Sequence, residues 1–216
     1  MPSRTLYHFK HSPFSRRTRL AIAHKRLDVE LREARENPAF LEEALRLVPF
    51  RTLPVLVDEG RAMGDSLAIA HWLDHVYPDA PRLFPDGEGA LDALQTVALV
   101  DVALDNIVNL GTRYYPLNDS PAWDGIKSEL LGRAGRALEA LAARVASLPR
   151  PTLYESGWSV ADMWIWSAVS WLEGMPPRAQ GNKNVTQILT LGVAVPAALS
   201  KWAAQHNGRA DVRALV

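Results

Sequence analysis

The chain has 216 residues, 48% of them hydrophobic and 22% charged, an ordinary balance for a globular protein of one or two domains. Its 24 basic and 24 acidic residues cancel to a formal net charge of zero, so neither nucleic acid nor a membrane surface is expected as a partner. The absence of Cys excludes disulfides, thiolate metal sites and a cysteine nucleophile, so any sulfur chemistry must use a thiol from the substrate.

The first residues, MPSRTLYHFK, lack the apolar core of a signal peptide. No window approaches the roughly 18 apolar residues of a membrane span. A cytoplasmic protein is therefore expected.

The first 80 residues alternate strand patterns with helix patterns. Thr5–Phe9 is a short aromatic strand, and the basic, amphipathic segment Ser15–Lys25 predicts a helix. Leu27–Leu31 alternates apolar and charged residues, which is typical of a strand, and Pro38–Leu47 predicts a short helix. Strand, helix and strand in this order predict a parallel pair.

A hairpin and a third helix complete this unit. Leu53–Val57 is an apolar strand opened by a proline, and the turn at 58–60 (Asp-Glu-Gly) returns the chain into Arg61–Met63. The helix Ser66–Val76 follows and is stopped by a proline at position 78. Residues 1–80 therefore predict an α/β domain.

Two prolines and a glycine in residues 81–88 indicate a linker, and the pattern of apolar residues changes after it. Residues 89–216 show no strand alternation, so we expect an all-helical second domain. The predicted helices are Ala90–Leu110, Trp123–Ser147, Ser159–Leu172, Gln187–Val193 and Ala197–His206.

Ser12 lies in the run Ser-Pro-Phe-Ser between the first strand and the first helix. A hydroxyl there stands beside a helix N-terminus, where unpaired N–H groups and the helix dipole favour an anion. Serine is also a preferred helix cap. The segment alone leaves both interpretations open.

Two further segments carry the same ambiguity. Thr52-Leu53-Pro54 stands at a strand start, where the Leu–Pro bond would be cis in a thioredoxin-like unit but trans in an ordinary edge strand. Asp65-Ser66 opens the third helix, where an acidic residue is also an ordinary N-cap.

Together, these segments carry a family resemblance. The runs SPFSRRTRLAIAHKRLDVE, TLPVLVDEG and DSLAIAHWLDHVYP, in this order, resemble the glutathione-binding domain of cytosolic glutathione transferases. The run GWSVADMW at Gly157–Trp164 is similar to the family's helix-capping signature, with Ser159 and Asp162 at the spacing of a capping box. The resemblance implies a thioredoxin-like N-terminal domain followed by an all-α domain.

The resemblance extends to a subclass. Serine at the active position, in the pattern S-x-x-S-x-R-x-R, is similar to serine-type classes such as zeta. The Asp-Ser pair, together with SPF and LAIAHK, is closer to the bacterial β-etherase-like and fungal-type branch. Asp65 also departs from the Glu that is usual in the family.

The resemblance assigns residue roles for glutathione, the implied co-substrate. Ser12 would donate a hydrogen bond to the thiolate, with Ser15 or an arginine as the alternative donor. Leu53, before Pro54, would pair its backbone with the cysteinyl unit. Asp65 and Ser66 would hold the γ-glutamyl end. Arg51 and Thr52 lie where relatives contact the glycyl carboxylate, although neither matches the usual Lys or Gln cleanly.

Two arginines and a set of polar or aromatic residues remain as candidates. Arg16 and Arg17 would either supply positive potential near the sulfur or lie on a solvated helix face. The pocket for a small hydrophobic electrophile is expected to draw on the second domain. Its candidate lining residues are Phe14, Asn106, Tyr114 and Tyr115.

No metal is expected. His71 and His75 stand four residues apart on a predicted helix, but the zinc-protease pattern lacks its Glu and a third ligand. The resemblance implies a homodimer through the third and fourth helices.

The expected activity is transfer of glutathione to a small electrophile. Glutathione-dependent ether cleavage or isomerisation is a close variant, and a non-catalytic binding or regulatory protein is the alternative from another class.

Overall fold

A computed structural model describes residues 4–178 and 182–215. The first part of the chain forms a four-stranded sheet in the order β2-β1-β3-β4, in which β1 runs parallel to β2 and the other neighbours are antiparallel. The predicted parallel pair and terminal hairpin are thus confirmed. The elements are β1 (Arg4–His8), α1 (Pro13–His24), β2 (Glu30–Glu33), α2 (Pro38–Leu47), β3 (Val55–Asp58), β4 (Arg61–Gly64) and α3 (Ser66–Val76).

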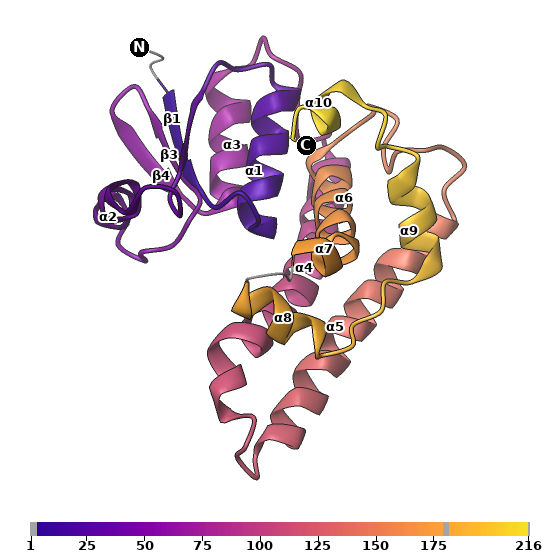
Figure 1. The fold of residues 1–216 in the computed structure, drawn as a ribbon. Coiled ribbons are helices and arrows are strands. Elements are labelled where there is room, and N and C mark those ends of the chain that lie inside the picture. The colour runs from indigo at the N-terminus through magenta and orange to yellow at the C-terminus, as the bar shows by residue number, and fades with distance from the viewer. Residues whose placement is uncertain (1–3, 179–181, 216) are drawn as a thin grey trace.

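Both faces of the sheet are covered (Figure 1). Because side chains alternate along a strand, Leu6 and Leu56 point into the core shared with α1 and α3. Their neighbours Tyr7 and Val55 point the other way, into a smaller cluster with α2. The C-terminal end of β1 therefore lies between the start of α1 and the segment that leads into β3, since Tyr7 pairs with Val55.

The second part is helical (Figure 1), and its long helices α4 and α5 form a pair that projects away from the sheet. The central helix α6 packs against both α1 and α4, so it joins the two parts. The elements are α4 (Glu88–Asn109), the π-helical turn η1 (Leu110–Tyr114), the 3-10 turn η2 (Tyr115–Leu117), α5 (Trp123–Ala146), α6 (Val160–Glu173), α7 (Met175–Arg178), α8 (Lys183–Leu189), α9 (Ala197–Ala204) and α10 (Ala210–Arg213).

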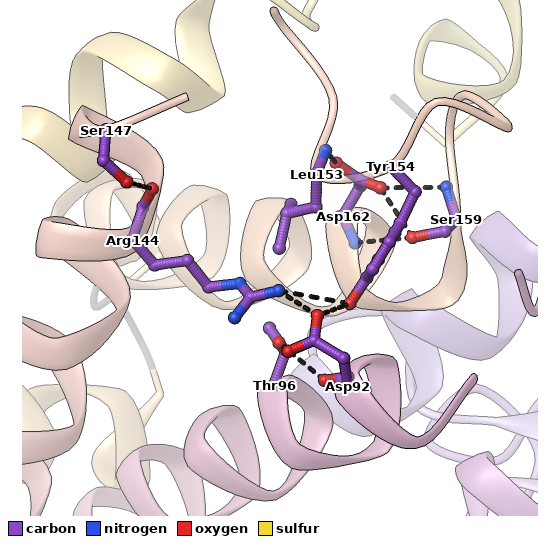
Figure 2. Close-up of polar contacts among 8 residues, drawn as sticks. All are labelled: Asp92, Thr96, Arg144, Ser147, Leu153, Tyr154, Ser159 and Asp162. Carbon is purple, nitrogen blue, oxygen red and sulfur yellow. Dashed lines mark hydrogen bonds and ion pairs between the residues drawn. The ribbon is translucent and has the colours of Figure 1, made fainter. Parts of the chain in front are cut away.

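The predicted capping box opens α6 (Figure 2). The Ser159 hydroxyl accepts from the Asp162 backbone N–H, and the Asp162 carboxylate accepts from the Ser159 backbone N–H at 3.0 Å. The same carboxylate accepts from the Leu153 N–H at 2.9 Å, so it also fastens the preceding loop. Burial raises the pKa of Asp162, although these hydrogen bonds oppose the shift.

One hydrophobic core runs through both parts. Its buried members include Leu20 of α1, Ile69 of α3, Leu104 of α4 and Trp164 of α6, each fully or almost fully excluded from water. The segment between α3 and α4, from residue 77 to residue 87, contains the predicted linker except for residue 88, which is the first residue of α4. The domain division at 1–80, 81–88 and 89–216 stays a prediction.

Two predicted elements begin and end at other residues in the structure. β2 begins at Glu30, three residues after its predicted start, because Leu27 and Val29 pack on the core as a loop while an edge strand pairs with β1. The helix predicted at Gln187–Val193 is α8, four residues earlier, because Asn182 caps its start and Gly192, at φ +69°, ends the segment. The short helices α7 and α10 were missed.

Candidate active site

A cleft of about 590 Å³ opens between the two parts of the molecule. Its first wall comes from the β1–α1 connection, α2, the 51–54 segment and the start of α3; its second wall is the last turn of α4 and η1. Eight of the sequence candidates line it: Ser12, Phe14, Arg51, Thr52, Leu53, Pro54, Asp65 and Ser66. Three segments far apart in the sequence therefore meet at one site.

Ser12 is the N-cap residue of α1, and its Oγ accepts a hydrogen bond from the Ser15 backbone N–H at 3.3 Å. A hydroxyl carries one donor hydrogen besides its acceptor lone pairs. Capping therefore uses an acceptor of Ser12 and leaves its hydrogen available to a group in the cleft, so the two interpretations from sequence are compatible.

Ser15 is a poorer candidate for contact with a ligand. It is fully buried, and its Oγ accepts from the Phe9 backbone N–H at 3.2 Å. Ser15 does not line the cleft. The serine that faces the cleft is Ser12.

The Leu53–Pro54 peptide bond is cis. It lies directly before β3, and its neighbour Arg51 has a positive φ of +52°. This segment brings Arg51, Thr52, Leu53 and Pro54 to the same wall of the cleft. The backbone N–H and C=O groups before Val55 lie outside the strand pairing of β3, so they are available to a peptide-like ligand.

Asp65 is the N-cap of α3, and one of its carboxylate oxygens accepts from the N–H groups of Leu67 and Ala68, each at 2.9 Å. Its backbone lies at φ +67° and ψ 128°, a sparsely populated conformation that costs on the order of 1–3 kcal/mol. Such strain clusters at functional sites, and here it lies between the hairpin and Ser66, the first residue of α3.

Arg17 is almost completely buried behind this helix start. Its Nε donates to the Ser66 Oγ at 2.8 Å, and its Nη1 is hydrogen-bonded to the Asp101 carboxylate of α4. Its guanidinium stacks between the rings of Phe14 and Trp164, 5.0 and 4.7 Å from their centroids. Because Ser66 accepts from Arg17, its own hydroxyl hydrogen is left to donate toward the cleft.

One interpretation from sequence placed Arg16 and Arg17 on a solvated helix face, and that interpretation is wrong. Arg17 is only 2% exposed, and Arg16 is half-buried, donating from Nη1 to the Ser170 Oγ of α6 at 3.0 Å. Their helix faces another helix rather than water, a contact between residues 154 positions apart that local sequence does not contain. Arg16 does not line the cleft.

The helical wall is formed by Asp105, Val108 and Asn109 of α4 and by Thr112 and Arg113 of η1. Sequence reasoning missed all of them. Their i, i+3, i+4, i+7 spacing is a helical stripe, but amphipathicity alone does not say which stripe faces a cleft.

The three candidates expected on this wall lie outside the lining. The Asn106 amide donates back to the Val102 carbonyl at 2.6 Å within α4. Tyr114 is 41% exposed, and the Tyr115 ring packs edge-on against Trp123, with centroids 5.8 Å apart. The helix presents the residues one position before Asn106 and Tyr114 instead.

Two carboxylates of α4 interact at this wall, Asp105 in the lining and Asp101 behind it. Burial raises the pKa of Asp105, and the neighbouring Asp101 carboxylate raises it further. Burial likewise raises the pKa of Asp101, although Arg17 opposes the shift. Arg17 and Arg113 oppose the shift at Asp105 without cancelling it, so the charged form of Asp105 is disfavoured.

Over residues 4–178 and 182–215 there is no group of three or more His, Asp or Glu residues placed to hold a metal ion. His71 stacks on Phe84, with ring centroids 4.0 Å apart. Within the same ranges no helix is both long and apolar enough to cross a membrane.

Comparisons with known proteins agree with this geometry. Residues 6–81 match the family profile of the glutathione S-transferase N-terminal domain. A probable glutathione S-transferase of Oryza sativa subsp. japonica is 31% identical over 125 residues, covering 51% of this chain and 50% of the relative. A probable maleylacetoacetate isomerase of Vibrio cholerae is 36% identical over 109 residues, covering 49% and 50%. The chain is thus matched to about half the length of these curated relatives.

The likeness in fold extends over the whole chain. A glutathione S-transferase of Methylobacillus flagellatus KT, solved with glutathione bound, superposes with a TM-score of 0.74 at 24% identity and covers 99% of both chains. The expected fold, a thioredoxin-like domain followed by a helical region, is confirmed. Residues 6–81 thus match the glutathione S-transferase N-terminal domain, and the chain as a whole has the fold of the solved glutathione S-transferase.

Proposed function

We propose that this protein binds glutathione and directs its thiolate at a small electrophile. The observation that carries the proposal is the convergence of Ser12, the cis Leu53–Pro54 segment and the Asp65–Ser66 helix start on one cleft. The thiol would lie at the start of α1, the cysteinyl backbone at Leu53, and the γ-glutamyl carboxylate at the start of α3, where Ser66 has a hydrogen to donate.

The energetics of thiol activation fit a single hydroxyl at a helix start. A thiol with a pKa near 8.5 is about 3% ionised at pH 7, and lowering that pKa by two units requires about 2.7 kcal/mol of preferential stabilisation. A hydrogen bond to a charged acceptor supplies about 1.5–3 kcal/mol, and a helix N-terminus up to about 2 kcal/mol. Ser12 at the start of α1 is sufficient without covalent catalysis.

The proposed reaction is a nucleophilic substitution. The thiol proton leaves to solvent, a sulfur lone pair forms the new S–C bond, and the leaving group departs with the electron pair of the bond that breaks. Phe9 and Phe14, with Leu41 and Leu45 of α2, give the cleft an apolar wall for the carbon skeleton of the electrophile.

The test is titration of the protein with glutathione while thiolate absorbance is followed as a function of pH. We expect binding with a thiol pKa below its free value. Ser12→Ala should raise that pKa while leaving affinity largely intact, and Ser12→Thr, which keeps a hydroxyl and a cap, should restore the lowered value. Binding without a lowered pKa would favour a non-catalytic binding protein, and absence of binding would remove the proposal altogether.

Isomerisation with glutathione is the second candidate, because one relative carries the name maleylacetoacetate isomerase. In that reaction the thiolate adds to a conjugated double bond and is expelled after rotation, so glutathione is not consumed. Measuring glutathione consumption against substrate loss separates isomerisation from conjugation and from ether cleavage.

We also propose a homodimer through α3 and α4. On α4 the residues Leu91, Gln95, Ala98 and Val102 are exposed at alternating spacings of four and three, a seam typical of helix pairing. Leu91 is 68% exposed and Val102 43%, an apolar surface that a second copy would cover. Sedimentation should give twice the chain mass, and Val102→Glu should shift it to one chain. A cytoplasmic location stays a prediction.

A further inference from the structure

The cleft holds one cation more than the proposed glutathione site uses. Glutathione bound as a thiolate carries three anionic groups: the sulfur and two carboxylates. The first wall of the cleft offers three positive positions for them, at the start of α1 beside Ser12, at the start of α3 beside Ser66, and at the Arg51 guanidinium. Arg113, on the opposite wall, is then the positive group of the lining to which no anionic group of glutathione is assigned.

Within residues 4–178 and 182–215 the Arg113 side chain forms no hydrogen bond and no ion pair. The acid that interacts with it electrostatically is Asp105, whose carboxyl group still has a raised pKa because burial and Asp101 outweigh Arg17 and Arg113. Asp65, across the cleft, is already used as the cap of α3. The Arg113 charge is therefore available to a ligand.

The backbone that carries Arg113 is fixed. It belongs to the π-helical turn η1, a form of helix that occurs frequently at functional sites. The helix α8 packs directly on this turn, because Gly111 lacks a Cβ that would collide with the Ile188 side chain. Thr112 and Arg113 follow Gly111 and face the cleft.

We infer that the second substrate is an electrophile bearing a carboxylate, and that Arg113 is the residue that selects it. This inference rests on the proposed transfer of glutathione. The aromatic and aliphatic wall would hold the reactive carbon skeleton near the sulfur, and the guanidinium on the opposite wall would pair with the carboxylate, for which its planar fork is suited.

The test uses two electrophiles of similar shape, a charged chlorodinitrobenzoate and the matching neutral chlorodinitrobenzamide, and compares each variant with the unmodified protein on the same electrophile. In each reaction the glutathione sulfur forms a bond to the ring carbon, and chloride leaves with the electron pair of the C–Cl bond. Rates are corrected for the uncatalysed reaction. We expect Arg113→Gln to lower kcat/KM for the benzoate by about tenfold and to leave the benzamide within about twofold.

Two variants complete the design. Arg113→Lys should recover part of the benzoate rate, because it retains the charge without the fork. Arg136→Gln removes an exposed arginine of α5 that does not line the cleft, and it should leave the ratio of benzoate to benzamide unchanged.

Equal losses for both electrophiles in Arg113→Gln, or the same change of ratio in Arg136→Gln, would overturn the inference while leaving glutathione transfer intact. If the unmodified protein accelerates neither electrophile but binds glutathione with a lowered thiol pKa, the inference fails alone. If it neither binds glutathione nor accelerates either reaction, the proposed function and the inference fail together.

Discussion

Two polar networks anchor the helical part of this protein, and they differ in reach. The Asp162 network at the start of α6 joins residues at most nine positions apart, and none of its members lines the cleft. The Arg17 network joins α1 to Ser66, 49 positions away, and to Asp101, 84 positions away. Ser66 lines the cleft, so the second network couples folding of the two parts to the geometry of the site.

The comparison teaches that burial of charge has two uses here. Asp162 satisfies backbone and hydroxyl donors that would otherwise be orphaned, which stabilises a loop and a helix start. Arg17 orients a hydroxyl for a ligand while neutralising a carboxylate from another helix. The first should matter for stability alone, the second for stability and binding.

The largest expected effect is on stability. Asp162→Ala removes the acceptor of two buried backbone N–H groups and of the Ser159 hydroxyl, at about 1–3 kcal/mol each. We expect the free energy of unfolding in urea to fall by about 3–5 kcal/mol. Glu139→Ala, at an exposed position of α5, should stay within about 0.5 kcal/mol. A loss of glutathione affinity in folded Asp162→Ala would erase the contrast between the networks.

The next effect is on stability and binding together. Arg17→Met keeps the apolar stem but leaves Ser66 without its donor and the partly buried Asp101 without its counter-charge. We expect unfolding to be easier by about 2 kcal/mol and the glutathione Kd, from calorimetry, to rise about tenfold.

The matched control is Arg16→Met, in the same helix, which loses the hydrogen bond to Ser170 and the contact of the guanidinium with the Trp166 ring, both on α6. It should lower stability without changing the glutathione Kd. Equal changes of Kd in the two variants would mean that the charge of α1, rather than the Ser66 contact, governs binding.

A smaller loss is expected from the Tyr154 hydroxyl, which donates to Asp92 at 2.6 Å beside the Arg144–Asp92 ion pair (Figure 2). Tyr154→Phe should cost about 1 kcal/mol of unfolding free energy, because the ion pair persists and the group is partly exposed. Glutathione binding should not change. A change in Kd would show that this side of the helical part also communicates with the cleft.

The smallest effect concerns pH. The pKa of Asp105 is raised in the folded protein by burial and by Asp101, whereas the unfolded chain has the ordinary value of 3.8. The folded state therefore binds this proton more tightly, and the stability it contributes is present below pH 3.8 and lost as pH rises through the folded pKa. Asp105→Asn should gain stability relative to the unmodified protein between acidic and neutral pH.

The measurement is the difference in unfolding free energy between the two proteins near pH 3 and near pH 7. Asp119→Asn, in an exposed loop, serves as the control for loss of one acidic group. A difference that is flat or falls with pH would contradict a raised pKa at Asp105.

The sequence by itself determined much of the local structure. Helical patterns located α2 and α3 to the residue, and the Ser159–Asp162 spacing identified a capping box whose partners are three positions apart. The order of four motifs indicated a resemblance to glutathione transferases, and the segments around Ser12, Pro54 and Asp65 do meet at the cleft. These features depend on near neighbours or on motif order, which a linear sequence preserves.

Only the tertiary structure decided the rest. A helix such as α4 has several polar stripes, and the stripe that faces the cleft depends on how α4 packs against α5 and α6. For this reason Asp105 of α4 and Arg113 of the following turn η1 line the cleft, whereas Asn106 and Tyr114 do not. The burial of Arg17 likewise arises from helices brought together by the shared core. Long-range packing fixes these positions because the hydrophobic effect is non-directional: a local pattern marks an apolar face but not the helix that the face will meet.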